Sequence, residues 1–190
     1  SLKPGAARVP QRGRRRGVHG SAHILFGART YRDSLGFTGD DQGVVGVDAA
    51  VHYGRFPLGF EFGFSGAADN RETRFGNFYA DVGSSASEFY LGARITGDLA
   101  RGRVRPYVGT GVTFLNVESD RLSNQFIFTD DDTTVAGYVH GGALFQFGQG
   151  RARFSIGLDV RWVYSADIVL FGDHLDVDYL QVGPTFGVTF

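Results

Sequence analysis

The sequence predicts an all-β fold, an eight-stranded antiparallel up-and-down transmembrane β-barrel over residues 18–190. Three observations predict it. Apolar residues alternate with small or charged residues in eight segments, which is the period of a β-strand with two different faces. The apolar side chains are too many and too bulky for the interior of a small barrel. The connections between segments alternate between short and long, as in outer-membrane barrels.

The composition excludes several other classes of protein. The chain has 190 residues, which suits one domain, and 42% of them are apolar. No window approaches the run of about 20 apolar residues that a transmembrane helix needs, so a helical membrane protein is excluded. The absence of Cys excludes disulfide frameworks, thiolate zinc sites and cysteine nucleophiles. The formal charge of -1 gives no general case for binding nucleic acid.

Residues 1–17 precede the first predicted strand and carry six basic residues but no apolar core. A signal peptide needs an apolar stretch of about 7 to 15 residues, so this segment is not an intact one. Its Gly, Pro and Arg residues cannot bury enough apolar surface to offset the entropy of ordering. We therefore expect a flexible basic tail on the periplasmic side.

Each of the eight segments presents one uncharged apolar face and one face of glycines and charged groups. The segment 58–64 shows this most clearly, because Leu58 and three phenylalanines alternate with two glycines and Glu61. In chain order, the segments and the marked residues of their opposite faces are 22–28 with Arg29, 45–53 with Asp48, 58–64 with Glu61, 89–95 with Glu88 and Arg94, 108–114 with Gly109 and Gly111, 135–147 with His140, 154–164 with Asp159 and Arg161, and 180–190 with Gly183 and Gly187. We expect one strand in each.

The sizes of the two faces indicate which one lines the interior. An eight-stranded barrel is only just wide enough for modest side chains, so the bulky apolar set would not fit inside. The reverse arrangement is sensible, because large apolar groups then face lipid while glycines make room for charged side chains that pair across a narrow lumen. A soluble lipocalin-like barrel would need the opposite arrangement. A β-sandwich remains the alternative architecture.

The lengths of the connections predict the orientation of the barrel. Outer-membrane barrels have short periplasmic turns and longer external loops. Both termini are therefore expected in the periplasm, with four loops at the surface of a Gram-negative cell. The short turns are predicted near residues 55–57, 98–103 and 148–150, and the long loops near 33–43, 69–86, 118–133 and 166–177. Closure is favoured because an open edge in lipid would leave backbone groups without partners.

Two segments add a family resemblance. The run Arg105-Pro-Tyr-Val-Gly-Thr-Gly-Val112 places Pro-Tyr before alternating glycines, and the last strand ends on Phe190 with Phe186 and Val188 at every second position before it. Together with the loop lengths, these segments resemble the small outer-membrane β-barrel group that includes the OmpA transmembrane domain, OmpX and OmpW. The resemblance covers about residues 18–190. It implies that Phe186, Val188 and Phe190 form the C-terminal signal read by the barrel-assembly machinery, and that outer-membrane lipids and lipopolysaccharide surround the protein.

Sorting the charges by this topology gives the barrel a polarity along its axis. The tail and short turns hold twelve bases and one acid, and the external side holds four bases and fifteen acids. The lumen is nearly neutral, and its predicted network consists of Arg29, Asp48, Glu61, Glu88, Arg94, His140, Asp159 and Arg161. Counting from the periplasmic ends places Glu61 near Arg94, Arg29 near Asp48, and His140 near Asp159. Ion pairs that satisfy one another in a filled lumen are favoured over a gated ion path, because eight strands leave little open bore.

The predicted loops contain acidic and apolar clusters. Asp130, Asp131 and Asp132 are weak candidates for gathering divalent cations near lipopolysaccharide phosphates, although their spacing matches no defined metal loop and a solvated surface is the simpler interpretation. The apolar pieces 126–128 and 168–171 would extend hairpins above the membrane or form an adhesive patch, and the first is favoured.

Aromatic residues near the predicted rims fit interfacial girdles. They include Tyr31, Tyr53, Trp162, Tyr164 and Phe190.

The sequence offers little indication of catalysis and implies no cofactor. His19 and Ser21, with His23 nearby, fall at the periplasmic start of the first strand. The resemblance to lipid A deacylases would call for a His-x-Ser pair on a lipid-facing, external part of the barrel instead. Gly109-Thr-Gly111 lacks the third glycine and the helix of a dinucleotide fingerprint.

We therefore expect a non-enzymatic outer-membrane protein with a filled polar lumen and acidic external loops, in a structural or surface-interaction role. OmpW-like passage of small apolar solutes through a loop-lined pocket is the alternative. A lipid A-modifying enzyme is a third possibility, and fold alone does not decide among them.

Overall fold

The structure is a computed structural model that describes residues 17–32, 41–54, 56–75, 78–123, 126–148, 150, 152–164 and 166–190. The predicted tail up to residue 16 and most of the first predicted loop, residues 33–40, lie outside these ranges. Among the described residues, no helix is long and apolar enough to span a membrane.

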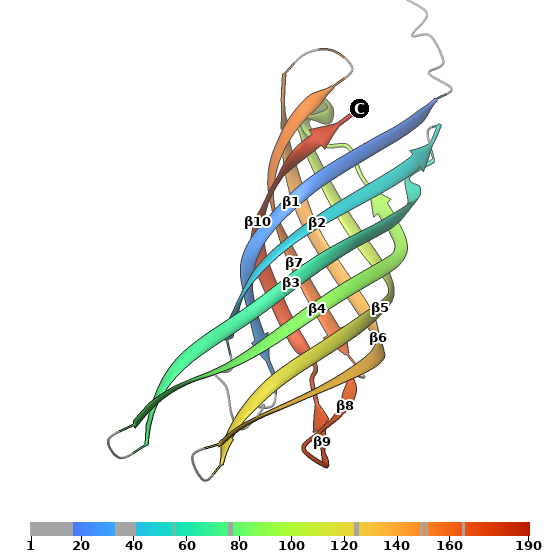
Figure 1. Cartoon of the computed structure of the whole chain (residues 1–190). Helices are drawn as coiled ribbons and strands as arrows, with labels where there is room; N and C mark the ends of the chain where they lie inside the picture. The colour runs from blue at the N-terminus through green and yellow to red at the C-terminus, as the bar shows by residue number, and fades with distance from the viewer. Residues whose placement is uncertain are drawn as a thin grey trace, which may run out of the picture.

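Eight antiparallel strands close into a barrel in the order β1-β10-β7-β6-β5-β4-β3-β2 (Figure 1). The strands are β1 (Val18–Tyr31), β2 (Asp41–Tyr53), β3 (Leu58–Phe75), β4 (Phe78–Thr96), β5 (Val104–Ser123), β6 (Phe126–Phe147), β7 (Arg153–Tyr164) and β10 (Tyr179–Thr189). Strand β10 closes the barrel on β1, and Gly20 and Phe190 exchange backbone hydrogen bonds of 2.9 Å. The predicted eight-stranded up-and-down barrel is confirmed, and the β-sandwich is excluded.

All described short turns lie at one end of the barrel together with the start of β1 and the C-terminus, and we call this the termini end (Figure 1). The turn between β4 and β5 contains a 3-10 turn, η1 (Ala100–Gly102). Gly54 and Gly102 have positive φ values of 63° and 80°, a conformation that favours glycine in tight turns. The longer connections lie at the opposite end, the loop end. The predicted sorting of short and long connections is confirmed.

Two of the predicted long loops are largely strand instead. Strands β3, β4, β5 and β6 have 18, 19, 20 and 22 residues, whereas crossing a membrane takes about 9–11. Backbone pairing continues to Phe75 with Phe78 and to Ser123 with Phe126, so both connections are tight hairpins that project past the barrel wall (Figure 1). The prediction failed because residues 69–82 and 118–133 do not alternate apolar with polar residues, and that alternation is the pattern from which strands are predicted.

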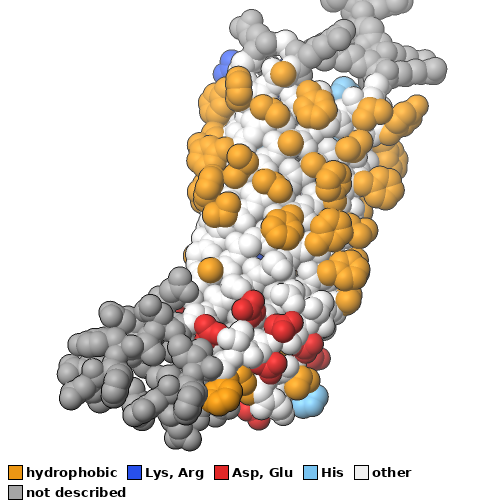
Figure 2. Space-filling view, viewed as in Figure 1, with side chains coloured by type: hydrophobic (Ala, Val, Ile, Leu, Met, Phe, Trp, Pro, Cys, Tyr) orange, Lys and Arg blue, Asp and Glu red, His pale blue; other side chains and the backbone are white. Residues whose placement is uncertain are grey.

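The outer wall is apolar on every strand, and the acids gather toward the loop end (Figure 2). Phe62, Leu91, Trp162 and Phe186 are examples of large side chains that the closed barrel leaves exposed. Their neighbours in sequence point inward and are buried or half-buried. The predicted assignment of the two faces is confirmed.

The last strand carries the predicted assembly signal on this wall. Phe186 and Phe190 are exposed, and Val188 is half-buried. Phe186 and Val188 therefore lie on the outward face of β10, and Phe190 directly follows the strand on the same side.

Candidate functional site: the barrel interior

All eight residues of the predicted lumen network lie inside the barrel. Seven are buried, and Asp48 is half-buried with 10% of its side chain exposed. They come from six different strands, because each strand turns every second side chain inward. In a narrow interior these polar groups must satisfy one another, since a buried unpaired charge is costly.

A cluster on the termini side is centred on Glu61 of β3. Its carboxylate accepts hydrogen bonds from Arg94 Nε at 2.6 Å and from the Tyr138 hydroxyl at 2.7 Å. His140 Nε2 lies 2.9 Å from the same carboxylate, and its Nδ1 lies 2.9 Å from Asp159. An imidazolium satisfies this arrangement, because both of its ring nitrogens are donors. The predicted pairs Glu61 with Arg94 and His140 with Asp159 are confirmed.

A second cluster, toward the loop end, is centred on Glu88 of β4. Its carboxylate accepts hydrogen bonds from Arg29 at 2.8 Å, from Tyr179 at 2.6 Å and from Arg161 at 3.4 Å. Thr113 and Ser65 donate to it at 2.8 and 2.9 Å. This one carboxylate thus serves two arginines and three hydroxyls from five other strands.

The predicted pairing of Arg29 with Asp48 is wrong. In the register of β1 and β2, His23 stands opposite Asp48, while Arg29 stands opposite Gln42. Arg29 therefore lies six residues farther toward the loop end, within reach of Glu88. Asp48 is contacted by His23 at 3.0 Å and by Arg94 at 3.5 Å.

Sequence reasoning missed the tyrosines of the interior. Tyr90, Tyr107, Tyr138 and Tyr179 are buried and donate to the carboxylates or lie under the arginines, with the Arg161 guanidinium 3.6 Å from the centre of the Tyr90 ring. The sequence did contain an indication of their place, because each tyrosine lies on the same face of its strand as the charged residues and glycines. Tyr31, predicted at a rim, is also buried, because it shares the inward face of β1 with Arg29.

Glycines make room for these rings. A Cβ on Gly63 would clash with the Tyr90 ring, one on Gly92 with the Tyr138 hydroxyl, and one on Gly142 with the Tyr107 hydroxyl. The predicted role of glycine in the lumen is correct, but at these positions the space goes to tyrosine rather than to a charged side chain.

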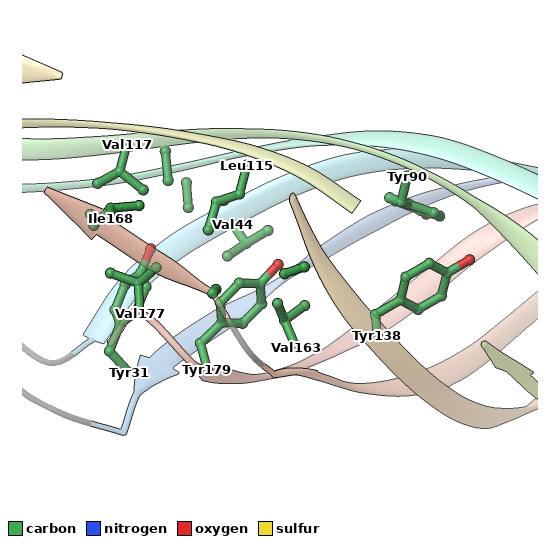
Figure 3. Close-up of a cluster of buried hydrophobic side chains, with 14 of the residues drawn as sticks. Tyr31, Val44, Tyr90, Leu115, Val117, Tyr138, Val163, Ile168, Val177 and Tyr179 are labelled. Carbon is green, nitrogen blue, oxygen red and sulfur yellow. The ribbon is translucent and has the colours of Figure 1, made fainter. Parts of the chain in front are cut away.

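The last long connection folds into a separate hairpin, β8 (Asp167–Leu170) and β9 (Asp173–Asp176). Ile168 and Leu170 are buried in an apolar cluster with Leu115 and Val117 of β5 (Figure 3). Tyr31 and Val177 lie in the same cluster. The apolar piece 168–171 thus packs into the loop end of the interior, and most of it forms neither a simple hairpin extension nor an adhesive patch.

Two of the three predicted loop aspartates hold this hairpin. The Val169 backbone N–H donates to Asp132 Oδ2 at 2.7 Å, and the Phe171 N–H donates to Asp130 Oδ2 at 2.6 Å. The bonds from Val169 and Thr133 stabilise the ionised carboxylate and lower the pKa of Asp132. Asp131 is exposed and stands between them on the alternate face of β6. Among the described residues, no group of three or more His, Asp or Glu side chains is arranged to hold a metal ion.

The three residues considered for catalysis all lie near the termini end. His19 and Ser21 line a small pocket there, and His23 points inward onto Asp48. None of them is on the lipid-facing wall.

The comparisons with known proteins concern the fold. No family model and no curated protein matches this sequence. OprG, an outer membrane protein of Pseudomonas aeruginosa, superposes with a TM-score of 0.67 at 15% identity, over 92% of this chain and 97% of OprG. Ail, the attachment invasion locus protein of Yersinia pestis, superposes with a TM-score of 0.62 at 13% identity, over 91% of this chain and 99% of Ail. Neisserial surface protein A superposes with a TM-score of 0.58 at 12% identity, over 90% of this chain and 95% of that protein.

The fold is that of the small outer-membrane β-barrels. The resemblance noted in the sequence is therefore confirmed at the level of architecture. As in a small barrel of this kind, apolar groups face outward and the polar groups are enclosed.

Proposed function

We propose that this chain is an integral protein of the bacterial outer membrane, with a filled polar lumen and a structural or surface-interaction role rather than a catalytic one. The observation that carries the proposal is a closed wall with large apolar side chains exposed on all eight strands and charged groups enclosed. In water this wall would be an apolar surface far larger than those of monomeric soluble proteins. In lipid it is the expected surface, and closure leaves no backbone edge without partners.

The proposed orientation places the loop end outside the cell and both termini in the periplasm. The two projecting hairpins and the β8–β9 hairpin all lie at the loop end, where exposed acids such as Asp131, Asp167 and Asp173 gather. This surface would meet lipopolysaccharide and any partner at the cell surface. At the termini end of the barrel, Phe186, Val188 and Phe190 would present the assembly signal to the barrel-assembly machinery.

Migration on gels tests membrane insertion. The unheated protein, extracted in detergent, should migrate differently from the boiled protein, because a closed barrel resists unfolding by detergent. Loss of this difference, or solubility of the full chain without detergent, would contradict the proposal.

Single cysteines test the orientation, because the natural chain contains none. Asp173→Cys at the loop end should react with a membrane-impermeant maleimide on intact cells, and the matched Ala152→Cys at the termini end should react only after lysis. Both side chains are exposed. The reverse pattern would overturn the orientation and leave the barrel itself untouched.

Passage of small apolar solutes, the alternative from the sequence, would require movement at the loop end. The β8–β9 hairpin and the cluster around Leu115 and Val117 fill the interior there. An alkane would have to displace this hairpin, so the structure supports a filled lumen more directly than a transport path. Native mass spectrometry showing a retained alkane that competes with the hairpin would favour transport.

A further inference from the structure

The termini end of the barrel holds a small pocket that the proposed function does not use. Its lining includes two arginines and two histidines, Arg94, Arg105, His19 and His52, with hydroxyls from Ser21 and Thr96. No carboxylate is among the described residues that line it. Its composition is therefore that of a site for an anion.

The register of the sheet explains why these basic groups gather. His19 of β1 stands opposite His52 of β2, His52 opposite Gly59 of β3, and Gly59 opposite Arg94 of β4. Four neighbouring strands thus place these residues in a single row around the inner wall. Gly59 makes room for the His52 ring, because a Cβ there would lie 2.7 Å from it.

Arg94 forms the deep side of the pocket, and its guanidinium lies 4.5 Å from the centre of the Tyr107 ring. It is buried, with only 2% exposed. Its Nε donates to Glu61 and its Nη1 lies 3.5 Å from Asp48, but Nη2 has no hydrogen-bond partner among the described residues. A buried guanidinium donor calls for an acceptor, and an anionic oxygen forms the strongest bond to it.

Arg105 supplies the charge at the mouth of the pocket. Among the described residues it pairs with Asp98 at 3.0 Å, and the Asp98 side chain is 67% exposed. An ion pair with one solvent-exposed partner contributes little, so Arg105 is able to exchange Asp98 for another anion. His52 is held by a contact of 3.1 Å between its Nε2 and the Thr96 hydroxyl.

We propose that this pocket binds an oxyanion of the phosphate class, with one oxygen on Arg94 Nη2 and the remaining oxygens facing Arg105. The cavity volume is about 20 Å³. That is room for about one water-sized group, so a single oxygen enters and the rest of the anion stays at the open mouth. Free inorganic phosphate and a lipid headgroup phosphate share this chemistry.

Calorimetry with inorganic phosphate tests the site, using the full chain in an uncharged detergent at low ionic strength. Arg105→Gln should weaken binding about tenfold, because one charge-assisted contact is lost. Arg105→Lys should retain part of the affinity. The matched control Arg32→Gln removes an exposed arginine beyond β1 at the loop end and should leave the affinity unchanged. Heat-modifiable migration verifies that each variant is folded.

Histidine ring signals localise the binding. Phosphate should shift the ring resonances of His52 and His19, and those of His174 on β9 should stay in place. In lipid nanodiscs, retention of phosphatidic acid that depends on Arg105, without binding of free phosphate, would identify a lipid headgroup as the source. Failure of both anions to bind, or equal binding by wild type and Arg105→Gln, would overturn the proposal.

Discussion

At the scale of single residues, the interior depends on one carboxylate more than on any other described group. Glu88 is fully buried and is the acceptor that Arg29 and Arg161 share. Tyrosine rings stack on both guanidiniums, with Arg29 4.0 Å from the centre of the Tyr179 ring. Removal of the charge would leave both buried cations without the carboxylate that they share.

Glu88→Gln should therefore destabilise the barrel by about 3–5 kcal/mol, the range for breaking a buried charge pair. Unfolding in urea, followed by the fluorescence of Trp162, the only tryptophan, measures the change. Glu118→Gln is the matched control on an exposed position of β5 and should stay within about 0.5 kcal/mol. Equal effects of the two substitutions would contradict a central role for Glu88.

Interior glycines provide a second prediction at this scale. Gly92→Ala would push a methyl group into the Thr110 carbonyl and the Tyr138 hydroxyl, and overpacking of this kind costs about 1–3 kcal/mol. Gly66→Ala meets no atom within 4 Å and should be neutral or slightly stabilising. The same unfolding experiment compares them. A tolerated Gly92→Ala would show that the Thr110 backbone and the Tyr138 side chain are both free to move.

At the scale of elements, the β8–β9 hairpin is the part that local patterns described least well. Its residues Ile168 and Leu170 look like an isolated apolar piece in the sequence, and only the fold shows that they join the buried cluster that includes Leu115 and Val117. Two side chains of β6, Asp130 and Asp132, set its position because they accept hydrogen bonds from its backbone amides. A local pattern cannot encode a contact between carboxylates and amides about forty residues away.

Asp132→Ala should release the hairpin, because the Val169 amide loses its acceptor. We expect faster hydrogen exchange at Val169 and Phe171, with the barrel amides unchanged. Asp131→Ala changes a neighbouring exposed aspartate whose side chain is on the alternate face, and it should have no effect. Unaltered exchange in Asp132→Ala would show that the apolar cluster alone holds the hairpin.

The same contact predicts a dependence on pH. Hydrogen bonds from Val169 and Thr133 lower the pKa of Asp132 in the folded protein. Its contribution is therefore present above the ordinary pKa range of a carboxyl group and is lost as the pH falls through the lowered value. The Val169 amide shift, followed by NMR from neutral to acid, should titrate below the ordinary aspartate range. A midpoint at or above that range would contradict the hydrogen bond.

At the scale of the whole molecule, side chains and a hairpin occupy the interior of the barrel at two levels. The Glu61 and Glu88 clusters cross the middle of the lumen, and the β8–β9 hairpin packs over its loop end. This geometry favours the interpretation of paired charges in a filled lumen over that of a gated ion path, because each charge is held by partners on other strands.

Planar-bilayer recordings should accordingly show no stable large conductance. Replacement of residues 167–176 by a short turn should also give no stable large conductance, since the two charge clusters remain. A steady open channel in the natural chain would contradict the filled lumen. A channel seen only in the shortened chain would show that the hairpin alone closes the barrel.

The sequence by itself determined the barrel, the number of its strands, the outward apolar face and the residues of the lumen. These depend on alternation along each strand and on the lengths of turns, which are local properties. Only the tertiary structure decided that Arg29 serves Glu88 rather than Asp48, that tyrosines share the interior, and that residues 167–176 fold over its end. Those contacts depend on the stagger of strands around a closed barrel and on segments distant in the chain, and no local periodicity specifies either.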